Sequence, residues 1–331
     1  MLRALLLRAS RSRFLESQAR KRSLVRRGVR RFLPGERLED ALEACQELAG
    51  RGIPAVLTCL GENVVSEKEA DAAARGYREA AHSIREKGLD IQLSVKPTHF
   101  GLDLGFESTA ERMEALLEAA EGAEVPLWLD MEGATYVDRT LDLYRRLLLR
   151  AGPRVGICLQ AYLHRTPMDL EEVLAAGGRI RLVKGAYRES AADALQDRAA
   201  VDGAFLALAE RLAREPLTEP GLRHVLGTHD LGLLERLGLG PHDADRHKAD
   251  RHKADRHEAD PHEGGKGSTP ANGGPLPVQM LYGIQEDAWD ALVRRDIPFR
   301  VLISYGAHWY PWFMRRLAER PSNLRFVLGR N

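Results

Sequence analysis

The chain has 331 residues, of which 44% are hydrophobic, and its formal net charge at pH 7 is +1. That length and composition support one large hydrophobic core. The balanced charge argues against a dedicated nucleic-acid-binding protein, which would usually be strongly basic. The 3 cysteines are widely spaced and form no CxxC pair. We therefore expect neither a disulfide framework nor a metal site, and a reducing compartment fits best.

The N-terminal segment is strongly basic. Residues 1–31 contain eleven Lys and Arg against one acid, Glu16, which gives this segment a charge of +10. An Arg-rich, acid-poor start is typical of a mitochondrial transit peptide, whereas its apolar stretch is too short for a secretory signal. We favour the alternative, a basic helical arm over residues 1–35. No apolar run approaches the roughly 18 residues that a membrane span requires.

Short apolar runs recur along the rest of the chain, separated by amphipathic helical patterns. The runs are continuous rather than alternating, which is typical of strands buried on both faces. They are Ile53–Cys59, Ile91–Val95, Pro126–Met131, Val155–Gln160, Ile180–Val183, His224–Gly227, Val278–Tyr282 and Phe299–Ser304. Eight alternating β and α units predict a (β/α)8 barrel of the TIM type over residues 36–331, with a doubly wound sheet as the alternative. An additional helix, about Glu36–Gly50, precedes the first strand.

Local signals predict where several helices begin and end. Ser66 with Glu69, and Ser108 with Glu111, have the spacing of capping boxes, in which a serine side chain caps the first turn. Glycine readily adopts the left-handed conformation that ends many helices. Four glycines follow helical patterns in this way: Gly88, Gly122, Gly152 and Gly177.

One segment departs from this alternation. From Asp243 to Glu263 the chain repeats a five-residue unit of the ADRHK type, and a Gly/Pro/Ser/Asn-rich stretch follows to about Pro277. Such a polar segment buries too little apolar surface to order, so we expect a low-complexity disordered insert at about 241–277. Five of the 11 histidines lie here, and a metal-binding tract is one interpretation. We favour repeat expansion without a ligand role, because histidines without a rigid scaffold fix no coordination geometry.

Polar residues gather where the predicted strands end. Active sites of this kind of barrel lie at the carboxyl ends of the strands. Five consecutive strand ends carry such groups: Lys96; Asp130 and Glu132 around Met131; Gln160; Arg181 and Lys184; and Thr228, His229 and Asp230. This rim is rich in cations, which predicts an anionic ligand.

The last helical pattern, residues 309–319, is aromatic and contains two adjacent arginines. A surface face on which Arg315 and Arg316 pair with Glu319 is one interpretation. Aromatic side chains also suit a lid over a planar or apolar ligand, and arginine binds a carboxylate through two parallel hydrogen bonds. The pair Arg315 and Arg316 is therefore a candidate carboxylate-binding group.

With these residues in view, the sequence resembles the proline dehydrogenase family. The matching stretches are RFLPGE (31–36), LGENV (60–64), SVKPTHFG (94–101), WLDMEG (128–133), VGICLQAYLHRT (155–166), RIRLVKGAYRES (179–190), GTHD (227–230), VQMLYGI (278–284) and WYPWFMRRLAERPSN (309–323). They span the chain outside the insert and the first thirty or so residues, and the LVKGAY and RRLAE blocks are the most specific. The resemblance implies a monofunctional enzyme with noncovalently bound FAD. It would oxidise L-proline to Δ1-pyrroline-5-carboxylate, by hydride transfer from proline C5 to flavin N5.

The resemblance also implies roles for individual residues. The proline carboxylate would be held by Lys96, Arg315 and Arg316. Asp130 would orient that cluster, and Arg181 would approach flavin N5. Arg181 and Gln160 would favour the reduced, anionic flavin. The FAD would be lined by Met131, Gln160, Lys184, Gly185, Ala186, Thr228 and His229.

One predicted strand departs from the family pattern. The family often has Tyr-x-Pro-Tyr-Gly before its last helix, with the first Tyr against the substrate ring. Here the chain reads Leu302-Ile303-Ser304-Tyr305-Gly306, and Leu302 supplies no hydroxyl. A dehydrogenase that prefers or also accepts 4-hydroxyproline is therefore an alternative. The insert also replaces a linker that is usually short and ordered, near the adenine end of the FAD site.

Two further assignments stay open. A Schiff-base barrel of the class I aldolase type would use Lys184, with its pKa lowered by neighbouring cations. A non-enzymatic module would bind anionic surfaces through the basic N-terminus.

The resemblance suggests a quinone as electron acceptor. A quinone would bring the enzyme to a membrane surface, which the basic arm suits. A separate pyrroline-5-carboxylate dehydrogenase and no nucleic-acid partner are expected. The expected location is the cytoplasm, at the inner face of the membrane, or the mitochondrial matrix in a eukaryote.

Overall fold

A computed structural model describes residues 12, 17–19, 28–122, 124–215, 222–240, 275–310 and 312–314. Eight parallel strands close into a barrel in the order β1-β2-β3-β4-β5-β6-β7-β8. The predicted (β/α)8 barrel is thereby confirmed. The chain divides into two compact units, the first made of Met1–Leu127, Leu281–Ile284 and Val301–Asn331, and the second of Trp128–Met280 and Gln285–Arg300.

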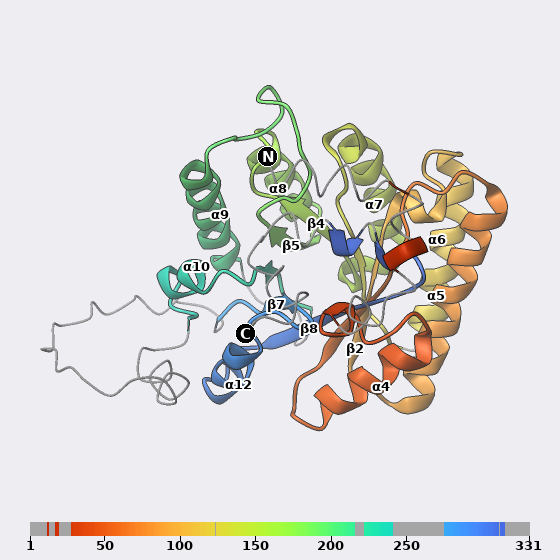
Figure 1. Cartoon of the computed structure of the whole chain (residues 1–331). Helices are drawn as coiled ribbons and strands as arrows, with labels where there is room; N and C mark the ends of the chain where they lie inside the picture. The colour runs from red at the N-terminus through yellow and green to blue at the C-terminus, as the bar shows by residue number, and fades with distance from the viewer. Residues whose placement is uncertain are drawn as a thin grey trace, which may run out of the picture. The chain divides into compact units, whose positions relative to one another are not determined.

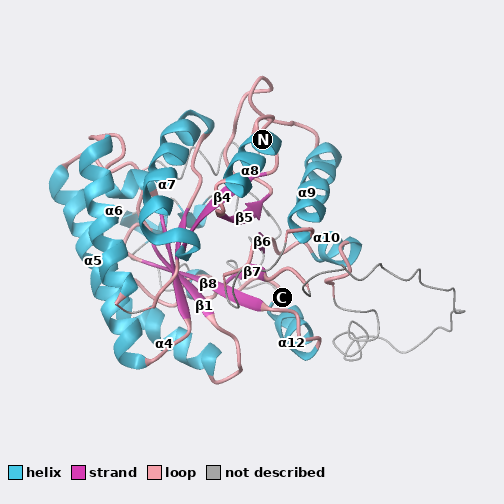
Figure 2. Ribbon diagram, turned by 180° about the vertical axis from the view of Figure 1, so that it is seen from behind, coloured by secondary structure: helices cyan, strands magenta, loops and turns pink. Residues whose placement is uncertain are grey.

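The first unit contains β1 (Ala55–Cys59), β2 (Ile91–Val95) and most of β8 (Phe299–Tyr305). In register, Ala55 of β1 lies opposite Ile91 of β2 and Val301 of β8. Its helices are α4 (Leu38–Ala49), α5 (Glu67–Lys87), the 3-10 helix η1 (Pro97–Phe100) and α6 (Phe106–Glu121). Helices α5 and α6 run side by side in Figures 1 and 2. Helix α4 confirms the additional helix predicted before the first strand.

The second unit contains most of β3 (Leu127–Leu129), together with β4 (Val155–Gln160), β5 (Arg179–Val183), β6 (Val225–Gly227) and most of β7 (Val278–Leu281). Strands β4 to β7 pair in sequence, each parallel to the next. Its helices are η2 (Ala134–Tyr136), α7 (Val137–Ala151), η3 (Gly152–Arg154), α8 (Thr166–Ala175), α9 (Arg198–Ala213), α10 (Leu231–Arg236) and α12 (Glu286–Arg294). Figure 2 shows α8 beside the β4–β5 pair.

Helix α5 begins and ends as the sequence predicts. The Ser66 hydroxyl accepts a hydrogen bond from the Glu69 N–H at 3.3 Å, and the Glu69 carboxylate accepts one from the Val65 N–H at 3.1 Å. These bonds satisfy N–H groups that the first turn leaves open. Gly88 ends the helix at φ 60, in the left-handed region that glycine adopts without strain.

Helix α6 begins earlier than the sequence predicts. It starts at Phe106 after Gly105, so the capping box assigned to Ser108 and Glu111 is wrong. The Ser108 hydroxyl instead donates to the Gly105 carbonyl at 3.4 Å, a bond that serines inside helices commonly make. Gly122 ends this helix in the right-handed conformation, at φ −61.

The strand ranges agree closely with the sequence. Strands β2 and β4 have the predicted bounds, whereas β3 begins one residue after Pro126 and ends two residues before Met131. Of the described part of the chain, no helix is long and apolar enough to cross a membrane. Most of the basic arm, and the predicted insert up to residue 274, lie outside the described residues.

Candidate functional site

The carboxyl end of β5 carries a buried ion pair. Arg181 is 3% exposed, and its guanidinium donates to the carboxylate of Asp130, which directly follows β3. A second nitrogen of Arg181 donates to the Gln279 side-chain oxygen on β7 at 3.2 Å. Burying a charge is costly unless it is paired and hydrogen-bonded. These two partners fix the Arg181 guanidinium in one position inside the second unit.

The next residue with a charge, Lys184, lies between two carboxylates. Its Nζ donates to Asp202 of α9 at 2.5 Å and to Asp230, which precedes α10, at 2.8 Å. Burial raises the pKa of Asp230, but the hydrogen bond and the charge of Lys184 outweigh burial and leave it below its usual range. The Thr228 hydroxyl accepts from the Asp230 N–H at 3.1 Å. The predicted cation at this strand end is thus held by acids from two other elements.

A tight turn follows Lys184. Gly185 has φ 117, and a Cβ there would overlap the ring of Tyr162, so both the backbone conformation and the space require glycine. The Tyr162 N–H donates to the Lys184 carbonyl at 3.0 Å, and Leu163 forms an antiparallel bridge with Ala194. The loops after β4 and β5 therefore support each other. Such support keeps a binding loop rigid.

The loop after β3 is tied to the same structure. The Glu189 carboxylate accepts from the Ala134 N–H at 2.9 Å. The Gln160 amide at the end of β4 donates to the Glu132 carbonyl at 2.8 Å. Three loops of the second unit, after β3, β4 and β5, are thereby joined by hydrogen bonds.

The other predicted cofactor-lining residues lie on these same loops. Met131 and Thr228 are buried, His229 and Gly185 are partly buried, and Ala186 is exposed. All of them belong to the second unit. Together with Gln160, Arg181 and Lys184 they offer a thioether, an amide and two cations around one set of strand ends. That combination suits a large ligand with an anionic part.

Lys96 follows β2 in the first unit and is partly buried. Burial lowers the pKa of nearby His99 to about 4, and the charge of Lys96 adds to that shift. His99 is therefore neutral at pH 7. The other two residues assigned to carboxylate binding, Arg315 and Arg316, lie outside the described residues, as does Glu319.

The described aromatic residues of the last helical segment pack within the first unit. Their rings are buried in one hydrophobic cluster that includes the segment before α4: Val29, Phe32, Leu33, Leu60, Trp309, Tyr310, Trp312 and Phe313. The indole N–H of Trp309 donates to the Glu36 carboxylate at 2.8 Å. These aromatic side chains therefore contribute to the hydrophobic core of the first unit.

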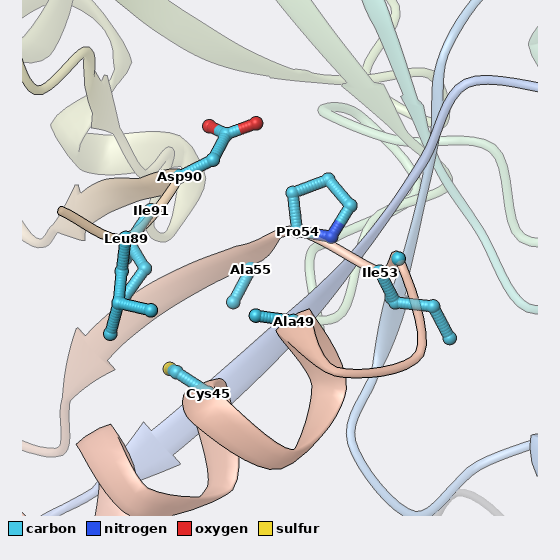
Figure 3. A pocket seen from close by; sticks show the side chains of 9 residues that line it. Cys45, Ala49, Ile53, Pro54, Ala55, Leu89, Asp90 and Ile91 are labelled. Carbon is cyan, nitrogen blue, oxygen red and sulfur yellow. The ribbon is translucent and has the colours of Figure 1, made fainter.

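A separate cavity of about 220 Å³ lies under α4 in the first unit. Figure 3 shows Cys45 and Ala49 of α4 on one side, with Pro54, Leu89 and Asp90 around them. These residues precede β1 and β2, so the cavity lies at amino ends of strands. Catalytic residues of (β/α)8 barrels come from carboxyl ends, and this cavity holds none of the predicted site residues.

Several residues at the second unit's site were missed from the sequence. Asp202 is inside a helix, and Gln279 is inside an apolar strand, so neither stood at a predicted strand end. Arg179 was placed before the strand, whereas β5 begins with it. Its spacing of two from Arg181 was a usable signal, because alternate residues of a strand share a face.

Comparisons with known proteins show which family this chain belongs to. A family model described as proline dehydrogenase matches residues 41–328. The chain is 33% identical over 304 residues to proline dehydrogenase 1 of Bacillus subtilis subsp. natto, covering 92% of this chain and 90% of that protein. It is 31% identical over 306 residues to the proline dehydrogenase of Deinococcus radiodurans, covering 90% of this chain and 88% of that protein.

A solved structure shares the fold. It is proline utilization A (PutA) from Bdellovibrio bacteriovorus, inactivated by N-propargylglycine, with a TM-score of 0.70 and 21% identity. The match covers 92% of this chain but 34% of the other, so this chain spans about a third of that longer protein.

Proposed function

We propose that this chain, which belongs to the proline dehydrogenase family, oxidises L-proline to Δ1-pyrroline-5-carboxylate with noncovalently bound FAD. The observation that carries the proposal is the ion pair between Arg181, buried within β5, and Asp130, which directly follows β3. A guanidinium that is held in place inside the barrel can stabilise negative charge that develops during a reaction.

The residues present fit a flavin dinucleotide. The turn at Gly185 brings backbone close to its surroundings, and positive charge is supplied by Arg181 in β5 and by Lys184 just after it. The residues that would hold FAD are Met131, Gln160, Lys184, Gly185, Ala186, Thr228 and His229. When bound, FAD would supply the hydride acceptor, its N5 atom. Asp202 and Asp230 contact Lys184 and hold its position at the end of β5.

The protein's own contribution is binding and orientation. Lys96, Arg315 and Arg316 would hold the proline carboxylate by charge-assisted hydrogen bonds. Asp130 fixes Arg181 and would orient the substrate-binding cations beside it. Positioning of this kind brings C5 of the ring to the acceptor and lowers the barrier by several kcal/mol. The proton of the substrate amine must leave before the hydride does.

Leu302 favours a second candidate substrate, 4-hydroxyproline. Leu302 lies in β8 with a partly exposed side chain, between the fully buried Val301 and Ile303. Strand residues alternate between faces, so Leu302 shares its face with Arg300 and Ser304 rather than with those neighbours. A leucine there leaves room that a tyrosine would fill.

The structure does not favour the Schiff-base alternative. The Lys184 amine donates to two carboxylates, which engages the nitrogen that a carbonyl substrate would have to reach.

The electron acceptor and cellular setting complete the proposal. A quinone would accept the electrons, with the basic N-terminal arm contacting an anionic membrane surface. A separate pyrroline-5-carboxylate dehydrogenase would consume the product.

Identifying the flavin and the product tests this proposal. Acid precipitation of the purified protein should release a flavin that chromatography identifies as FAD rather than FMN. Incubation with L-proline and a soluble quinone should form a product that reacts with o-aminobenzaldehyde. A colourless protein that takes up no FAD on reconstitution would exclude the assignment.

A further inference from the structure

Two guanidinium groups lie on a single indole inside the second unit. Arg179 and Arg181 are two apart in β5, so both point to the same face of the strand. Their guanidinium carbons lie 4.1 Å and 5.2 Å from the ring centroid of Trp128 in β3. Trp128 is fully buried, and Arg179 is 1% exposed. We call these three residues, together with Asp130, the arginine column.

This interior is unusual for a (β/α)8 barrel, which is normally filled by branched apolar side chains. Burial lowers the pKa of Arg179 to about 9, and the charges of Arg300 and Arg181 lower it further, while Tyr144 acts in the opposite sense. Arg179 thus remains charged at neutral pH. The face of an aromatic ring attracts a cation, and this attraction is strongest where water is excluded.

Gly156 leaves space for the arginine column because it has no side chain. A Cβ on Gly156 would lie 2.5 Å from a Trp128 ring carbon and 3.1 Å from Arg179 Nε. Tyr144 Oη accepts from the Arg179 N–H at 3.0 Å, and Arg179 Nη2 donates to the Arg154 carbonyl at 3.3 Å. The position of Arg179 is therefore fixed by β4, α7 and η3 rather than by the site above it.

The charges of the column do not balance. Asp130 pairs with Arg181, the upper guanidinium. The column therefore contains two cations and one carboxylate, and it points its Arg181 end toward the strand ends where the proposed cofactor would bind. A fixed positive charge in a low-dielectric interior acts over a longer distance than one in water.

We propose that Arg179 and Trp128 are positioning residues that raise the reduction potential of the bound flavin: Trp128 holds Arg181 in place, and Arg179 adds the second positive charge. The inference rests on the proposed function. Positive charge near the flavin stabilises its reduced, anionic form more than its neutral oxidised form. It follows that the lower arginine, which contacts neither substrate nor cofactor, affects the equilibrium of the reaction.

The test is the midpoint potential of the FAD in purified holoenzyme carrying Arg179→Met. Removing one buried charge should disfavour reduction about tenfold, which corresponds to about 30 mV for a two-electron couple. The melting temperature should stay unchanged or rise, because replacing a buried ion by an apolar side chain of similar length is often neutral or stabilising. Arg223→Met is the matched control, since Arg223 precedes β6 and is not part of the arginine column, and the potential of this variant should equal that of the parent.

Substitutions of Trp128 give a second measurement. Trp128→Phe keeps a smaller aromatic face and Trp128→Leu keeps none, so the potential should fall in the order parent, Phe variant, Leu variant. The affinity of the FAD-free protein for added FAD, followed by quenching of flavin fluorescence, should weaken in the same order.

An FAD-loaded Arg179→Met protein with the parental potential would overturn this inference while leaving the proposed function intact. Arg179→Gln also removes the charge but keeps hydrogen-bonding groups, and it serves if the methionine variant does not fold. A potential about 30 mV below the parent's supports the inference, and a potential equal to the parent's contradicts it. A parent protein that binds no FAD refutes the proposed function itself.

Discussion

The strand ends of the second unit differ sharply from the amino ends of β1 and β2 in the first. In or just after β3, β5 and β6, charged side chains are buried or partly buried and paired, as with Arg181 and Asp130 or Lys184 and Asp230. At the amino ends of β1 and β2, a cavity is lined mainly by apolar residues such as Ile53 and Leu89. A cavity can result from imperfect packing, whereas buried charge persists only where something compensates its cost. Buried charge is therefore the better guide to the working end of this barrel.

The largest effect should come from the arginine pair of the last helical segment. Arg315→Met or Arg316→Met should weaken proline binding by about 2–5 kcal/mol while FAD stays bound, because a carboxylate anchor loses one charged partner. Apparent affinity for proline in the FAD-loaded variants measures this. Arg145→Met, which removes a surface arginine paired with Asp142 and Glu172, is the control and should bind proline normally. If Arg315→Met and Arg316→Met both bind proline normally, the two arginines lie on a solvated surface and do not bind the carboxylate.

Breaking the ion pair at β5 should have the next largest effect. Asp130→Asn leaves the buried Arg181 without its carboxylate, so the free energy of unfolding should fall by about 2 kcal/mol, and kcat/KM should fall as Arg181 loses its fixed position. Denaturant titration and steady-state kinetics measure the two effects. Asp138→Asn removes the carboxylate that pairs with Arg165 but is 78% exposed, and it should cost less than about 1 kcal/mol. Equal losses in the two variants would show that burial does not distinguish the pairs.

Substitution at β8 should change substrate choice more than rate. Leu302→Tyr would fill the space beside a five-membered ring, so it should raise KM for trans-4-hydroxyproline more than for proline. Shape differences of about one methylene in an apolar pocket are worth about 1–3 kcal/mol. The ratio of kcat/KM for the two substrates, in both proteins, is the measurement. If the parent rejects hydroxyproline completely, or if the ratio does not change, Leu302 does not line the ring pocket.

The repetitive insert should matter little. Deletion of Asp243–Gly274 should leave a folded, flavin-loaded protein, because its composition has no apolar periodicity with which to contribute to a core. Flavin content and melting temperature test this expectation. Loss of FAD on deletion would assign the segment a part in the adenine end of the site.

The smallest effect should come from the cavity at the amino ends. Ala49→Leu adds apolar atoms beside Cys45, so stability should change by at most about 1 kcal/mol, and kcat and KM for proline should not change. A clear loss of activity would show that the cavity at the amino ends of β1 and β2 also matters for catalysis, and it would contradict the contrast with the strand ends of the second unit.

The sequence predicted the fold well because its signals are local and periodic. Continuous apolar runs bounded by helical patterns located the strands, and the serine cap and terminal glycine of α5 behaved as expected. The capping box predicted at Ser108 was wrong, because a serine inside a helix donates to a backbone carbonyl as readily as a serine at the start of a helix caps it. The packing of the aromatic residues around Trp309 on Phe32 could not be predicted, because composition alone does not say which rings pack on one another.

The site was only partly predictable. Residues at strand ends, such as Asp130 and Lys184, could be named from the barrel pattern alone. Their partners Asp202 and Gln279 could not, because contacts between distant elements depend on the closed barrel and leave no mark on the local sequence. Arg179 was overlooked because an arginine next to an apolar run is usually solvent-exposed at the end of a strand.

The central claim is that this barrel transfers electrons from proline to a flavin held at the strand ends of the second unit. The most direct test is the visible absorption spectrum of the purified protein, recorded without oxygen before and after addition of L-proline. We expect a flavin spectrum that bleaches when L-proline is added and persists when D-proline is added. A flavin spectrum that L-proline leaves unchanged would contradict it.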